Sequence, residues 1–131
     1  MSRAALGGEP SPALAEVRKF FDDRTADWDA NSKTNRHITR ETVANAASLA
    51  VLDAQTTGKL QPLTRLALDK MWTVQRKDGV WNWPKCSWPP FEVDDYYGAL
   101  VAALGVALGL VAGHLLVEGM AQAPPRPGDL A

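Results

Sequence analysis

The chain has 131 residues, of which 46% are hydrophobic, and its 14 basic residues nearly balance 15 acidic ones to give a net charge of -1. This length suits a single domain, and the absence of a basic excess argues against binding to nucleic acid. Cys86 is the single cysteine, which excludes an intrachain disulfide and a four-cysteine metal site, and we predict neither a metal nor a cofactor.

The first ordered element is expected to be a helix from Pro12 to Asp27. Ser11 followed by Pro12 is typical of a helix start, because serine caps free backbone N–H groups and proline fits the first helical turn. Residues 1–11 are predicted to be disordered, and the first ten lack the apolar run of a secretory signal. The compartment is left open between the cytoplasm and the membrane periphery.

A second helix is expected after the stretch from Asp29 to His37, which is polar and shows no periodicity. Thr39 is predicted to cap this helix, with Ile38 packing on Val43 across the cap. The helix is expected to end at Gly58, since glycine adopts the left-handed conformation that closes helices. Its alanine-rich face suits close packing against another helix.

The third predicted helix starts with Pro62 in its first turn. Its apolar residues follow the spacing of an amphipathic helix, and Lys70 is the one departure from that pattern. Periodicity then vanishes from Gln75 to Pro90, where glycine and prolines interrupt regular structure. Because this loop contains three tryptophans, it is expected to pack on a surface.

The last predicted helix starts near Val93 and ends near Met120, followed by a proline-rich tail, 121–131, that is expected to be disordered. Within it, Gly98 to Val117 is almost continuously apolar and about 20 residues long, which is enough to span a membrane. The abundance of alanine, glycine and valine fits a helix buried among other helices equally well. Both interpretations stay open, as does peripheral contact with a membrane.

The spacing Gln75-x-x-x-Gly79-x-Trp81 resembles the Gln-Trp repeat of the squalene-hopene cyclase and triterpene cyclase superfamily, whose relatives include the protein prenyltransferase repeats. The segment from Asp78 to Ala99, which ends in Asp-Asp-Tyr-Tyr-Gly-Ala, also resembles a segment of bacterial prenyltransferase and squalene oxidase repeat proteins. The resemblance implies an all-α fold in which residues 12–120 form helical hairpins of a partial (α/α) toroid. It also implies that the glutamine bonds a neighbouring helix terminus and stacks on the tryptophan.

A second motif, Glu92-Val93-Asp94-Asp95, resembles the Asp-x-Asp-Asp motif with which class II terpene cyclases protonate an alkene. By this resemblance Asp94 is the proton donor and Asp95 its partner, while Glu92 stands where the family has its first aspartate. Aromatic faces that stabilise a carbocation would come from Trp81, Trp83, Trp88, Tyr96 and Tyr97. The alternative is structural, because acidic residues are favoured in the first turn of any helix.

We therefore expect a fragment of a squalene-hopene cyclase-like protein whose parent protonates and cyclises an isoprenoid substrate. A closed toroid needs on the order of 300 residues, so the remaining repeats are missing from this chain and the fragment alone is expected to be inactive. Two other functions remain possible on the sequence: a noncatalytic helical-repeat interaction module and a single-pass membrane protein.

Overall fold

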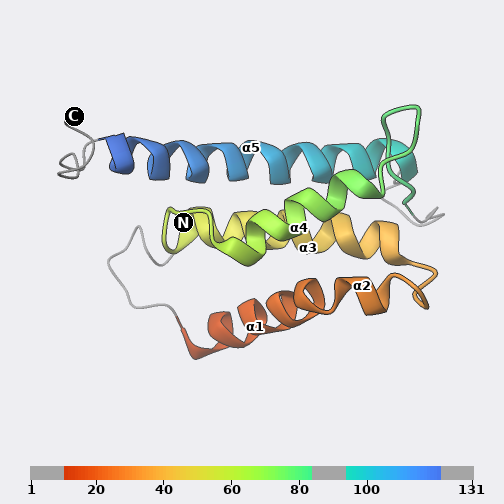
Figure 1. Ribbon diagram of the computed structural model, residues 1–131, viewed down its shortest axis with the longest axis horizontal. Coiled ribbons are helices and arrows are strands. Elements are labelled where there is room, and N and C mark those ends of the chain that lie inside the picture. Colours follow the sequence, from red (N-terminus) through yellow and green to blue (C-terminus); the bar gives the residue numbers. More distant parts are fainter. Residues whose placement is uncertain (1–10, 84–93, 122–131) are drawn as a thin grey trace, which may run out of the picture.

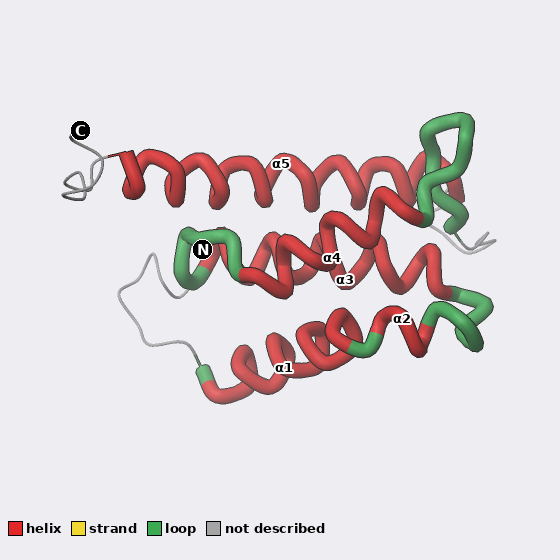
Figure 2. The backbone as a smooth tube through the Cα atoms, in the orientation of Figure 1, coloured by secondary structure: helices red, strands yellow, loops and turns green. Residues whose placement is uncertain are grey.

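The computed structural model describes residues 11–83 and 94–121, and within the last helix it describes the side chains from Tyr96 to Gly113. These ranges contain helices and loops but no strand, so the predicted all-α class is confirmed (Figures 1 and 2). The helices are α1 (Pro12–Ala26), α2 (Trp28–Asn31), α3 (Ile38–Gln55), α4 (Pro62–Thr73) and α5 (Asp94–Ala121).

Helix α3 lies at the centre of the arrangement and contacts α1, α4 and α5. Helix α5 runs along one edge of the molecule, and α1 with α2 lies along the opposite edge (Figure 1). The described helices therefore form an open array. A closed toroid needs more helices than the described residues supply, so the toroid stays a prediction.

Several predicted helix boundaries are confirmed and one is wrong. Pro12 and Pro62 both occupy the first turn of a helix, and Gly58 has a φ of 65° just after α3. The predicted cap at Thr39 is wrong, because α3 starts at Ile38 with His37 in the N-cap position. Asn35 binds two backbone N–H groups at this helix start: its Oδ1 accepts from His37 at 2.9 Å, and its backbone carbonyl accepts from Ile38 at 3.1 Å.

The stretch predicted to lack periodicity begins with a single helical turn, α2, which is held by contacts from distant elements. Trp28 Nε1 donates a hydrogen bond to Thr42 Oγ1 at 2.7 Å, and Lys70 Nζ lies 4.5 Å from the centre of the Trp28 ring. Lys70 also pairs with Asp29 at 2.7 Å. This explains why Lys70 interrupts the apolar pattern of α4: its ammonium group lies over an indole and beside a carboxylate.

The core lies between α3, α4, α5 and the loop that follows α4. Close packing of α3 on α5 depends on small residues, as the alanine-rich face of α3 predicts. A Cβ added at Gly105 of α5 would lie 3.1 Å from the Cα atom of Ala47, so the two backbones nearly touch. The buried cluster consists of Val43, Ala46, Leu49, Ala67, Leu68, Met71, Trp81 and Ala102.

Phe21 of α1 packs against this core, and polar contacts attach α1 as well. The carboxylate of Asp53, on α3, has an exposed fraction of 0% and accepts a hydrogen bond from Arg18 Nη1 of α1. It also accepts one at 2.8 Å from the backbone N–H of Gln61, the N-cap residue of α4. Arg18 Nη2 in turn donates to Thr64 Oγ1 at 3.1 Å. One buried carboxylate thus joins three helices.

Candidate functional site

The loop after α4 contains the predicted repeat motif, and the indole of that motif bonds the end of α4. Trp81 is buried, and its Nε1 donates a hydrogen bond to the backbone carbonyl of Met71 at 2.8 Å. That carbonyl belongs to the last turn of α4, where backbone oxygens lack partners within the helix. The indole therefore closes the C-terminal end of α4 and fills part of the core at the same time.

Gln75 acts inside the loop. Its Nε2 donates to the backbone carbonyl of Gly79 at 2.7 Å, and Gly79 has a φ of 87°, which a residue with a side chain rarely adopts. The resemblance implied that this amide bonds a neighbouring helix terminus and stacks on the tryptophan. In the structure the bond to the helix end is made by Trp81, and the ring that lies against Trp81 is Trp72, at 5.6 Å between centroids.

The aromatic residues predicted to bind substrate differ in their burial and in the elements that they contact. Trp81 is in the core, whereas Tyr96 is exposed on α5. Trp83 lies against Tyr97, with 5.4 Å between their ring centroids, so this pair joins the loop to the start of α5. Trp81 and Tyr96 therefore lie in different environments. Trp88 lies outside the described residues.

The predicted catalytic acids fall in or beside the first turn of α5. Asp94 and Asp95 are the first two residues of that helix. This position is the one that the helix-start interpretation requires and is equally compatible with the predicted acid role. Their side chains, and the whole of Glu92, lie outside what the structure describes.

Elsewhere in the described residues, the most buried acidic groups have charged or amide partners. Glu41 of α3 accepts hydrogen bonds from Arg24, from Asn35 and, at 2.9 Å, from Asn31 Nδ2. The pKa of Glu41 is lowered, mainly by the hydrogen bond from Arg24, while partial burial opposes this shift. The charge of Arg24 and the hydrogen bonds from Asn35 and Asn31 lower the pKa further. Glu41 is therefore held as a carboxylate, which makes it unsuited to protonate an alkene.

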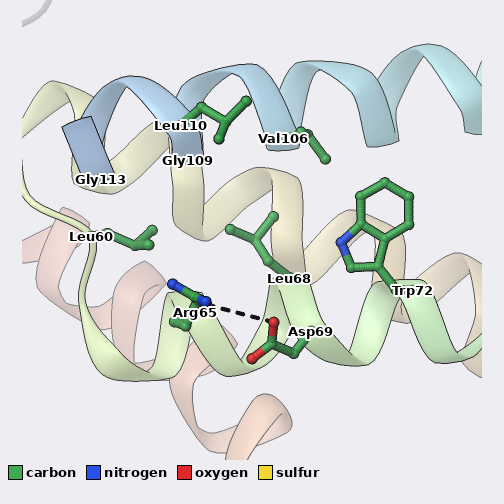
Figure 3. Close-up of a pocket in the computed structure, with 9 residues that line it drawn as sticks. All are labelled: Leu60, Arg65, Leu68, Asp69, Trp72, Val106, Gly109, Leu110 and Gly113. Carbon is green, nitrogen blue, oxygen red and sulfur yellow. Dashed lines mark ion pairs between the residues drawn. The ribbon is translucent and has the colours of Figure 1, made fainter.

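A groove between α4 and α5, which no sequence motif predicted, has a volume of about 530 Å³ (Figure 3). Leu68 and Trp72 from α4 form one wall, and Leu110 belongs to the opposite one. The Arg65 guanidinium and the Asp69 carboxylate form an ion pair across 3.6 Å on the α4 side. The full lining is Leu60, Arg65, Leu68, Asp69, Trp72, Val106, Gly109, Leu110 and Gly113.

This groove can hold an apolar side chain or a hydrocarbon, but its ionisable groups are paired and solvent-exposed. The signal that could have indicated it is the pair of glycines, Gly109 and Gly113, one helical turn apart on a helix that is otherwise rich in alanine and leucine. Within the residues that the structure describes, no group of three or more His, Cys, Asp or Glu side chains is placed to hold a metal ion.

Helix α5 has a second property that bears on function. Its segment Tyr96–Gly113 has a mean hydropathy of 1.8 with 28% of its residues buried, so it is long and apolar enough to cross a membrane. Neither a protein-family model, nor a curated protein, nor a solved structure matches the chain.

Proposed function

We propose that the chain is a helical-repeat module of a squalene-hopene cyclase-like protein, and that its described residues tie and dock helices without catalysing a reaction. The observation that carries this proposal is the loop from Gln75 to Trp81. Its indole bonds the end of α4 and its amide holds the Gly79 turn in shape. A motif used in this way stabilises a unit of helical structure.

The electrostatics of the described residues support the noncatalytic part of the proposal. Protonation of an alkene needs an unusually strong, neutral acid in a dry cavity, because an alkene is a very weak base. The buried carboxylate of Asp53 is paired with Arg18, and the groove between α4 and α5 is open to solvent and contains an ion pair. None of these groups meets the requirement.

In the same proposal, isoprenoid cyclisation belongs to the complete parent protein. Asp94 would transfer its proton to the substrate, Asp95 and Glu92 would tune that acid, and further repeats would close the dry cavity. The aromatic faces contributed by this chain would be those nearest the start of α5, Trp83 and Tyr97.

Two measurements on the full chain test the proposal. Incubation of the purified chain with squalene should give no cyclised product above a protein-free blank. Trp81→Phe keeps an aromatic ring but removes the donor to Met71, so we expect it to lower the free energy of unfolding by about 1–3 kcal/mol. Trp72→Phe is the matched control, because Trp72 is about half exposed and no hydrogen bond is assigned to its indole. Cyclised product, or equal stability of the two variants, would contradict the proposal.

A membrane-associated protein is the second candidate function, favoured by the apolar segment Tyr96–Gly113. The test is extraction of cell membranes with alkaline carbonate. Retention of the chain in the pellet would support a membrane span, and release into the supernatant would exclude it.

A further inference from the structure

Helix α5 has two apolar faces, and only one of them is covered in the described structure. The covered face carries small residues against α3, α4 and the loop after α4, among them Gly98, Ala102, Gly105 and Gly109. On the other face, described side chains from Tyr96 to Val111 are exposed, and none carries a charge. This outer face consists of Tyr96, Tyr97, Leu100, Ala103, Leu104, Ala107, Leu110 and Val111.

The outer face forms one continuous apolar stripe along α5. Its residues repeat every seven positions, with Tyr96, Ala103 and Leu110 in one series and Leu100 and Ala107 in another. A stripe of this kind can lie against a partner helix along its whole length.

A neighbouring ion pair disfavours lipid as the partner. Leu110 lines the groove that contains Arg65 and Asp69, whose side chains are 69% and 62% exposed. If a bilayer covered the outer face at this end, it would also cover these charges, which are costly to place in hydrocarbon. A protein partner can leave them at a wet rim.

We infer that the outer face of α5 binds the same face of a second copy of this chain, with the two α5 helices antiparallel. This inference rests on the proposed docking role and names its partner. The face is suited to pair with itself because it is uncharged, and a twofold axis requires the same patch on both molecules.

The available area and the order of side-chain sizes fit this pairing. Six large side chains of the face are roughly half exposed, which offers on the order of 600 Å² per copy and about 1,200 Å² per pair, the lower end for specific complexes. In the antiparallel register that places Leu100 opposite Ala107 of the other copy and Ala103 opposite Leu104, large residues meet small ones at the centre of the seam. Antiparallel helices also have opposed macrodipoles.

The first test is the mass of the full chain in solution, by light scattering or sedimentation at increasing concentration. The expected mass rises from 14.2 kDa to twice that value. Leu100→Glu should weaken association by at least about tenfold, because it buries a charge at the seam. Phe20→Glu on α1 is the matched control, since Phe20 is 54% exposed and Leu100 is 51% exposed, and it should leave association unchanged.

The second test fixes the direction of the helices by cross-linking and uses milder substitutions. In a Cys86→Ser background, Leu100→Cys and Ala107→Cys are prepared separately and oxidised alone or mixed. An antiparallel pair gives far more cross-linked dimer in the mixture than in either variant alone. More dimer within each variant alone would overturn the antiparallel arrangement.

Three further results would overturn the inference. They are a mass of 14.2 kDa at every concentration, equal loss of association in Phe20→Glu and Leu100→Glu, and a chain that stays single but floats with phosphatidylcholine vesicles. The unfolding and squalene measurements do not depend on dimer formation, so the failure of this inference can be separated from the failure of the proposed function.

Discussion

Replacing Asp53 should destabilise the chain more than replacing a charged residue at its surface. The Asp53 carboxylate is completely buried and accepts hydrogen bonds from Arg18 of α1 and from the backbone of Gln61 at the start of α4. Asp53→Asn places an N–H group where one of two donors now points, so at least one buried bond is lost. Removing one partner of a buried ion pair costs about 3–5 kcal/mol.

The surroundings of Arg18 reduce this figure, because its side chain is 22% exposed and also contacts Asp22. We therefore expect Asp53→Asn to lower the free energy of unfolding by about 2–4 kcal/mol. Asp22→Asn is the matched control: it removes a carboxylate from the same arginine, but Asp22 is 25% exposed and sits one helical turn away, so the expected cost is about 0–1 kcal/mol.

The assay is urea unfolding followed by circular dichroism, with the dependence on urea compared between variants to confirm that the same transition is measured. Similar losses of stability in the two variants would refute this prediction. An Asp53→Asn variant as stable as the unmodified chain would refute it too, because the buried carboxylate would then hold nothing together.

Three further predictions address other parts of the chain. Thr25→Val should raise the free energy of unfolding by about 1 kcal/mol, because the buried Thr25 hydroxyl has no hydrogen-bond partner and burial without one is unfavourable. Chemical denaturation measures this change, and a loss of stability would show that the hydroxyl is bonded. Because the folded pKa of Glu41 is lowered, its contribution is complete above the unfolded pKa near 4.3 and is lost as the pH falls below that value through the folded pKa. The difference in the free energy of unfolding between the unmodified chain and Glu41→Gln should therefore shrink as the pH falls from about 6 to about 3, roughly the range over which carboxylates titrate. A difference that stays constant over this range would show that the Glu41 carboxylate does not stabilise the fold. Gly105→Ala should lower the free energy of unfolding by about 1–3 kcal/mol, since the added Cβ would meet the backbone of Ala47 at 3.1 Å. Gly113→Ala should raise it by up to about 1 kcal/mol through helix propensity, because the nearest neighbour of its added Cβ is 3.9 Å away. A lower melting temperature for Gly113→Ala than for Gly105→Ala would refute this description of the packing.

Features set by local backbone chemistry could be predicted from the sequence. Pro12 and Pro62 mark helix starts because proline fits only the first turn, and Gly58 marks an end because its φ is positive. The packing of the tryptophan-rich loop follows from the large apolar area of tryptophan, but the sequence does not tell which tryptophan is buried, since Trp81 is buried and Trp72 is 48% exposed.

Features set by distant partners could not be predicted. Lys70 looks like an interruption of an apolar stripe until Trp28 and Asp29 are placed beside it, the latter 41 positions earlier in the chain. Asp53 looks like a surface acid near a helix end, because its partner Arg18 is 35 positions away. The groove between α4 and α5 arises where Gly109 and Gly113 face leucines of other elements; the sequence shows two glycines one helical turn apart but not the leucines that they meet.

Helix α5 brings the fold and the proposed function together. A helix that is apolar on all sides is stable in water only when each of its faces is covered, since exposed apolar area costs roughly 25 cal/mol per Å². Its inner face can be covered only by backbones that approach closely, which is why Gly105 meets Ala47. Its outer face carries leucines and tyrosines, so a partner on that side lies farther from the α5 backbone and must offer side chains of complementary size. Without a partner on this face those leucines would stay in water, and this unmet requirement favours the docking of a second copy on α5.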